Sequence, residues 1–439
     1  MKNSFITIIN CLSKLISRYL PDAFIFSLLI TIFVLLCGIF FKGYTYLEMI
    51  RFWGDGFWNL LQFSMQMCLV LVTGLALAKS NPVSKFLLSL SNIPKNQTQS
   101  VLLLTFISYS SCFINWGFGL VVSALFAVAL FKKTFNKNFG LLVAMAYSGF
   151  IVWHGGFSGS IPLKLTDPSE KIANIVNTKS IPLSSTVFSL YNILLVFGVL
   201  IILLTLGFLF SKIRTTQTYN ESYSPTKPNI KTDTKSVFEN STVFCFVICT
   251  FGLSYIFQSL YLDGKSFNLG LMTFTTFFIG LLFHKKISSY TTAFSDSISD
   301  SSNIILQFPF YAGIMGMINN SGMATDLSSF FISISDKDTF LMFTYWSAGV
   351  VNFFVPSGGG QWVIQGPIIL SAAKELGISL PKAAMAIAWG DAWSNMLQPF
   401  WALPILSIAG LKLKDIMAYC VIIFLFVGIY SSLVFYLVS

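Results

Sequence analysis

Residues 351–362 read VNFFVPSGGGQW and lie at the centre of an apolar stretch, 339–373, that is too long for one membrane crossing. A second stretch, 100–131, has the same design, with SSCFINWGFG at 110–119. A helix crosses the hydrocarbon core with about 20 residues. Non-helical backbone at that depth is tolerated only where it lines a cavity or is buried in protein. We therefore predict two re-entrant hairpins, each entering and leaving the membrane on one side.

Apolar segments of spanning length surround both hairpins. Of all 439 residues, 55% are hydrophobic and 10% are charged, whereas a soluble domain carries about 25% charged residues. The sequence therefore predicts an all-α polytopic membrane protein with about nine full spans and two re-entrant hairpins. The nine spans are predicted at 22–41, 57–78, 139–163, 183–211, 242–261, 267–283, 303–320, 384–409 and 416–438.

The charge distribution orients these spans. With the N-terminus in the cytoplasm, 18 of the 27 Lys and Arg residues fall in predicted cytoplasmic segments, as the positive-inside rule expects. The net charge of +10 comes without a basic stripe in polar sequence, which excludes nucleic acid as a partner. The seven cysteines form no CxxC pair and are interpreted as small hydrophobic residues. We expect a multi-pass protein of the bacterial inner membrane, in contact with membrane lipid.

The two halves of the chain resemble each other. Asp55 and Asp300 are 245 positions apart, as are Gln62 and Gln307, and Asn115 precedes Asn352 by 237 positions. An odd linking span between the halves makes the second half inverted, which is the plan of many secondary transporters. The predicted parts are an interfacial N-terminal helix (1–21), a first repeat with its hairpin (22–211), a cytoplasmic linker (212–241), a linking span (242–261) and a second repeat with its hairpin (262–439).

The hairpin centres contain the candidate substrate site. A half-helix that begins at such a centre points its free N–H groups and positive dipole end at the midplane, which suits an anion. Glycine lets backbone approach a ligand closely, although small residues also serve close helix packing. The residues predicted to bind substrate are Asn115, Gly117, Gly119, Asn352, Ser357, Gly358, Gly359, Gly360 and Gln361.

Two titratable residues are predicted to take part in ion coupling. Asp391 lies well inside a predicted span, where a carboxylate is expensive and is a functional hypothesis by default. It could carry a coupling proton or help coordinate Na⁺, and the alternative is a structural carboxylate at a helix break near Pro399. His154 lies in the matching broken segment, WHGGFSGSIP (153–162), and its alternative role is that of a hydrogen-bonded core residue.

The remaining residues limit the cargo and the chemistry. No Lys or Arg lies deep in a predicted span, which favours a monocarboxylate over a more highly charged anion, for which an Arg clamp is the natural partner. Residues 156–159 read GFSG, a pattern found in intramembrane serine hydrolases, where the serine requires a histidine from another helix. We expect no cofactor other than a co-transported H⁺ or Na⁺ and no resident metal.

Six motifs are long enough to be specific: WGDGFWNLLQFSMQM (53–67), FINWGFGLVV (113–122), GGFSGSIPL (155–163), LQFPFYAGI (306–314), VPSGGGQWVIQGP (355–367) and QPFWALPILSIAGL (398–411). Together they resemble the bacterial short-chain fatty acid transporter family. The resemblance runs through nearly the whole chain, and it implies uptake of a short-chain fatty acid such as butyrate or acetoacetate. It also implies kinship with the ion-transporter group of secondary carriers, with paired hairpins, a scaffold that forms a homodimer and an elevator-like movement.

These observations together predict cation-coupled symport of a short-chain monocarboxylate by alternating access. The alternatives are a carrier for another small anion such as a dicarboxylate, a passive channel and, more remotely, an intramembrane serine hydrolase that uses Ser158.

Overall fold

The computed structural model describes residues 21–133, 138–166, 172, 175, 180–213, 237–264 and 269–439. Every regular element in these ranges is a helix. The predicted interfacial helix at 1–21 lies outside the described residues except for Pro21, and so do residues 214–236 of the predicted linker.

The helices of the first part of the chain lie between residues 23 and 211. Polar side chains begin several of them: Asp22 accepts from Phe24 N–H, and Thr45 forms a capping box with Glu48, which satisfies N–H groups that a helix start leaves free. The elements are α2 (Ala23–Lys42), α3 (Tyr46–Gly56), α4 (Leu61–Ala78), α5 (Asn81–Ser91), α6 (Gln97–Ile114), α7 (Trp116–Phe131), α8 (Phe139–Ser148), the 3-10 helix η1 (Gly149–Gly155), α9 (Ser160–Thr166), η2 (Leu183–Ser185) and α11 (Leu190–Ser211).

The second part of the chain begins with a short helix and a long one that ends in a π-helical turn. Its elements are α12 (Val237–Asn240), α13 (Thr242–Phe257), η3 (Gln258–Leu262), α14 (Leu269–His284), α15 (Ile287–Ile298), η4 (Ser299–Ser301), α16 (Ser302–Asn320), α17 (Met323–Ser333), α18 (Phe340–Asn352), α19 (Gly358–Glu375), α20 (Leu380–Ser394), η5 (Asn395–Leu397), α21 (Pro399–Ala409) and α22 (Leu413–Leu437).

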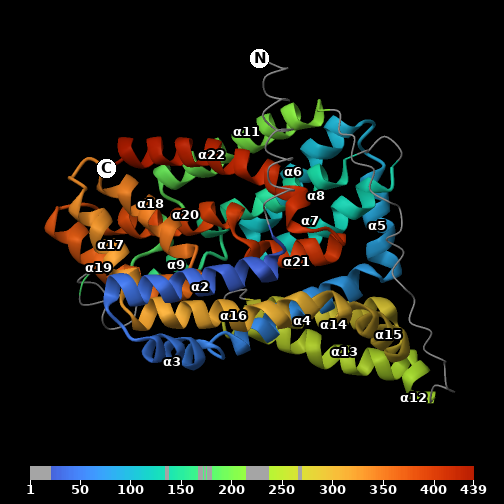
Figure 1. Ribbon diagram of the computed structural model, residues 1–439. Coiled ribbons are helices and arrows are strands. Elements are labelled where there is room, and N and C mark those ends of the chain that lie inside the picture. Colours follow the sequence, from blue (N-terminus) through green and yellow to red (C-terminus); the bar gives the residue numbers. More distant parts are fainter. Residues whose placement is uncertain are drawn as a thin grey trace.

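The helices group into two regions (Figure 1). One region, which we call the α16 layer, consists of α2, α3, α4 and α13–α16; in it α16 packs against α2 and α3, and α14 packs against α4 and α13. The other region, the hairpin bundle, consists of α6–α9, α11 and α17–α22, and its helices interleave elements from both parts of the chain, as where α11 packs against α22 and α20 against η1. The largest buried core lies mainly in this bundle.

Six helical segments in the described ranges are long and apolar enough to cross a membrane. They correspond to six of the nine predicted spans, and the count of nine stays a prediction. Predicted span 183–211 is shorter as a helix, because the continuous helix α11 begins only at Leu190. Large apolar side chains stand exposed along several of these helices, among them Ile201, Phe251 and Ile429, as expected of surface that faces lipid. The six are Ala23–Lys42, Leu61–Ala78, Phe139–Thr166, Leu190–Ser211, Thr242–Leu262 and Leu413–Leu437.

Candidate functional site

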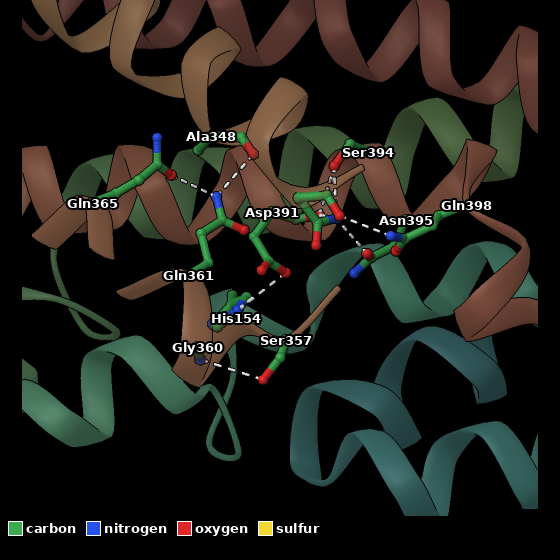
Figure 2. Close-up of polar contacts among 11 residues, drawn as sticks. His154, Ala348, Ser357, Gly360, Gln361, Gln365, Asp391, Ser394, Asn395 and Gln398 are labelled. Atoms are coloured by element: carbon green, nitrogen blue, oxygen red, sulfur yellow. Dashed lines mark hydrogen bonds and ion pairs between the residues drawn. The ribbon is translucent and has the colours of Figure 1, made fainter. Parts of the chain in front are cut away.

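His154 and Asp391 meet in the centre of the hairpin bundle. His154 lies on the 3-10 segment η1 and Asp391 on α20, and His154 Nε2 is 3.4 Å from Asp391 Oδ1 (Figure 2). Both side chains are fully buried, and both ring nitrogens and both carboxylate oxygens have no hydrogen-bond partner among the described residues. A buried ionisable group is stable only when it is paired or neutralised. The pair can therefore hold a shared proton or contribute an oxygen to a small cation.

The break between α20 and α21 is held by amide side chains. The Asn352 side-chain N–H₂ group, at the end of α18, donates to Asp391 O at 3.0 Å, to Ser394 Oγ at 2.8 Å and to Asn395 Oδ1 at 2.7 Å. Gln398 Nε2 in turn donates to Asn352 O at 2.7 Å. These bonds fix the broken segment that positions Asp391 (Figure 2). The Asn352 amide donors are thus engaged within the protein, and Oδ1 is the atom of that side chain left without a partner in the described part.

The tip between α6 and α7, which we call tip 1, is closed by side chains of the protein itself. Asn115 Oδ1 accepts from Gly117 N–H and Phe118 N–H, both at 3.1 Å, and Ser158 Oγ accepts from Trp116 N–H at 2.9 Å. A Cβ added at Gly119 would lie 2.5 Å from Cys112 N, so this glycine allows α6 and α7 to pack closely. The first three N–H groups of α7 are therefore satisfied before any ligand binds.

The tip between α18 and α19, which we call tip 2, consists of Ser357 and the three glycines that follow it. Ser357 Oγ accepts from Gly360 N–H at 3.3 Å. Among the described residues, no acceptor is found for Gly358 N–H or Gly359 N–H, as is expected of the first residues of a helix. A Cβ at Gly358 would lie 2.5 Å from His154 Nε2. Tip 2 therefore lies directly against the His154–Asp391 pair.

Gln361 holds α19 to its neighbours. Gln361 Nε2 donates to Ala348 O at 2.8 Å and to Gln365 Oε1 at 2.7 Å. Gln365 Nε2 continues the chain of bonds to Ser347 Oγ on α18 and Ser328 Oγ on α17. The side chain is completely buried, and its Oε1 has no partner in the described ranges.

The structure adds two side chains that sequence reasoning did not select. Lys164 Nζ donates to Gly359 O at 3.1 Å, and Ser160 Oγ lies 2.8 Å from the place of a Cβ on Gly358. Lys164 is the first residue after the predicted span 139–163, whereas helix α9 extends to Thr166 and brings Lys164 to tip 2. The spacing of Ser160 and Lys164 by four residues was the available signal, since such residues share a helix face.

Ser158 has a bonding partner that differs from the one a hydrolase requires. Its Oγ accepts from Trp116 N–H, while His154 faces Asp391, and within the described part of the chain no hydrogen bond joins His154 to Ser158. In the same residues no cluster of three or more His, Cys, Asp and Glu side chains is placed to hold a metal ion.

Comparisons with known proteins identify relatives along the whole chain. The model of the short chain fatty acid transporter family matches residues 5–438. A protein of Escherichia coli K12, provisionally named a short-chain fatty acid transporter, is 40% identical over 95% of this chain and 96% of its own length. A protein of Haemophilus influenzae with the same name is 39% identical over 94% and 96%.

Two solved transporters share a distant likeness. Alcanivorax borkumensis YdaH covers 84% of each chain at 15% identity with a TM-score of 0.45. Neisseria gonorrhoeae MtrF, described as belonging to a class of antimetabolite efflux pumps, covers 99% of this chain and 97% of its own at 14% identity with a TM-score of 0.44. The family match and the sequence relatives point to a multi-pass membrane transporter and not to an enzyme.

Proposed function

The chain belongs to the short-chain fatty acid transporter family, and from this premise we propose that it carries a short-chain monocarboxylate across the bacterial inner membrane by cation-coupled alternating access. Butyrate and acetoacetate are the substrates of the expected size. The observation that carries the coupling is the fully buried His154–Asp391 pair, with 3.4 Å between Nε2 and Oδ1, beside tip 2.

The coupling follows from electrostatics. A carboxylate inside a membrane protein is costly and marks an ion or substrate pathway. Asp391 and His154 lie on two different broken segments, α20–η5–α21 and α8–η1–α9. Binding H⁺ or Na⁺ at Asp391 would neutralise its charge and lower the cost of a substrate anion at the nearby tip. A substrate that binds well only after the cation would then be driven by the cation gradient.

The order of the helices supports a repeated architecture, and we propose that the two repeats are inverted, as in many carriers that work by alternating access. The pair α6–α7 has its counterpart in α18–α19, the broken α8–η1–α9 in α20–η5–α21, and α11 in α22. Helices α6 and α7 meet at tip 1 and helices α18 and α19 at tip 2, both inside the hairpin bundle, as the two arms of a re-entrant hairpin would. We propose that the hairpin bundle moves against the α16 layer, with the N-terminus in the cytoplasm and a homodimer formed through that layer.

A cavity at the boundary of the two regions is consistent with access from the cytoplasm. It has a volume of about 480 Å³ and lies between α4, α5, α7 and α15, with Lys79, Lys132, Asp296 and Asp300 on its walls. Burial lowers the pKa of Lys79, and the charges of Asp296 and Asp300 oppose that shift. With the N-terminus in the cytoplasm, segments 79–99, 132–138 and 284–302 are predicted to be cytoplasmic. These segments contain all four charged residues, so the cavity fits a form of the carrier that is open inward.

Uptake of labelled butyrate into proteoliposomes tests the proposal. Saturable accumulation is expected under a proton gradient or a Na⁺ gradient imposed separately, and the gradient that drives it identifies the ion. No uptake under either gradient would overturn the proposal. Stronger competition by a dicarboxylate than by butyrate would assign a different anion, and unsaturable flux without accumulation would indicate a channel.

A further inference from the structure

We propose that the substrate carboxylate binds at tip 2 and not at tip 1. Its binding site consists of Lys164, Ser160 and the first two N–H groups of α19. The inference rests on the proposed function, because it names the part of the site that recognises the anion. It also explains how binding of that anion is linked to the charge of Asp391.

Lys164 and Ser160 reach tip 2 from one face of α9. They are four residues apart and therefore point the same way on a helix, and α9 packs against α19 and α20. Lys164 Nζ donates to Gly359 O at 3.1 Å, and a Cβ at Gly359 would lie 3.0 Å from that ammonium. Glycine at this position therefore leaves the ammonium room beside the helix start.

Donors without partners gather at the same point. Gly358 N–H and Gly359 N–H have no acceptor among the described residues. Ser160 Oγ and His154 Nε2 are buried atoms without a hydrogen-bond partner there, and both lie within 2.8 Å of the position of a Cβ on Gly358. The His154 side chain is fully buried and points at this helix start. Buried polar atoms are normally hydrogen-bonded, so their convergence indicates a ligand that supplies acceptors.

The ligand that fits is a carboxylate. A helix N-terminus carries about half a positive charge, the Lys164 ammonium adds a full one, and the hydroxyl and N–H groups offer hydrogen bonds to two oxygens. His154 Nε2 borders both this point and Asp391 Oδ1, at 3.4 Å from the latter. A substrate carboxylate would therefore be repelled by Asp391 unless H⁺ or Na⁺ neutralised that residue. The arrangement links anion binding to cation binding through charge alone.

Tip 1 lacks these properties. Its first three N–H groups already donate to Asn115 and Ser158. A Cβ at Gly117 would meet Met272 Cε and Leu269 Cδ1, which are apolar atoms of α14. Tip 1 thus contributes to helix packing, whereas tip 2 binds the substrate, although the two tips occupy equivalent positions in the chain.

Calorimetric titration of the purified full-length protein in detergent separates the charge of Lys164 from its shape. Butyrate and the uncharged butyramide are titrated into wild type, Lys164→Gln, Lys164→Arg and Lys374→Gln. Lys374 is the matched control, because it lies at the other end of α19 and also donates to a carbonyl, Ile175 O, at 3.0 Å. Glutamine keeps a donor for Gly359 O and removes the charge.

Wild type and Lys374→Gln are expected to prefer butyrate. Lys164→Gln should weaken butyrate binding by about tenfold to a hundredfold, the usual range for a hydrogen bond to a charged group, leave butyramide binding unchanged, and be largely rescued in Lys164→Arg. Equal butyrate affinity in wild type and Lys164→Gln would overturn this inference alone. A wild type that binds no butyrate would overturn the proposed function with it.

A second variant tests the proposal if Lys164→Gln misfolds. If Lys164→Gln elutes as an aggregate, Ser160→Ala removes one neutral hydrogen bond and is expected to weaken butyrate binding by about twofold to tenfold without changing butyramide binding. Unchanged butyrate binding in a folded Ser160→Ala protein would then contradict the proposal that the carboxylate binds at tip 2.

Discussion

Tip 1 and tip 2 occupy corresponding places in the chain but differ in which hydrogen bonds remain available. At tip 1, Asn115 and Ser158 accept from the first three N–H groups of α7. At tip 2, Ser357 accepts from Gly360 N–H, the third of α19. The first two N–H groups have no acceptor among the described residues, and the residues that carry them, Gly358 and Gly359, lie beside His154, Ser160 and Lys164. A glycine-rich break in a membrane helix is therefore not by itself a binding site. What distinguishes the two tips is whether the protein has already used the donors.

The largest expected effect comes from removing the charge of Asp391, which lies close to tip 2. Asp391→Asn removes the carboxylate that we propose binds the coupling cation, so gradient-driven accumulation of butyrate in proteoliposomes should be abolished while butyrate exchange across the membrane continues. Asp326→Asn is the control: Asp326 pairs with Lys42 at 2.6 Å and is 57% exposed, and such pairs contribute about 0–1 kcal/mol. Unchanged accumulation in Asp391→Asn would remove Asp391 from the coupling mechanism.

A pair of glycine variants compares the tips directly. Gly358→Ala places a Cβ 2.5 Å from His154 Nε2, which sits in a rigid broken segment, whereas Gly117→Ala meets the ends of two flexible side chains, Met272 and Leu269. Overpacking of this kind typically costs about 1–3 kcal/mol, so Gly358→Ala should reduce the initial rate of butyrate uptake by about tenfold. Gly117→Ala should change it by less than about twofold.

The outcome of that comparison decides the division of tasks. Equal losses in both variants would mean that both tips bind substrate, as the sequence alone predicts. A loss in Gly117→Ala alone would move the site to tip 1. The amount of folded protein, measured by size-exclusion chromatography, has to be equal in the two variants.

The positions of the breaks could be predicted from the sequence, since Gly, Asn and Pro in a long apolar run are unfavourable in a continuous helix. Helix α6 ends at Ile114 and α18 at Asn352, inside the predicted polar centres 110–119 and 351–362. Asp391 and His154 were selected separately, as rare titratable residues in apolar segments, and the structure places them together.

The difference between the tips could not be predicted, because it depends on contacts between distant residues. Ser158 accepts from Trp116 N–H across 42 positions, and Lys164 reaches Gly359 O across 195. Local sequence treats Asn115 and Asn352 alike, although Asn115 caps a helix and Asn352 braces a break. Which donors remain free is a property of the packed bundle and not of either motif.

The smallest expected effect concerns stability. It compares the two tips by the hydrogen bonds that stabilise them and not by the donors left free for a ligand. Asn115→Ala removes the acceptor for two N–H groups at tip 1, and the loss of such a cap costs about 0.5–2 kcal/mol. Ser357→Ala removes a single, longer bond of 3.3 Å and should cost less. Thermal unfolding in detergent should therefore show the lower Tm for Asn115→Ala, while its affinity for butyrate stays at the wild-type value. A Ser357→Ala protein that unfolds at the lower temperature would contradict the difference in satisfied N–H groups between the tips. An Asn115→Ala protein that loses butyrate binding without losing stability would place the functional end at tip 1.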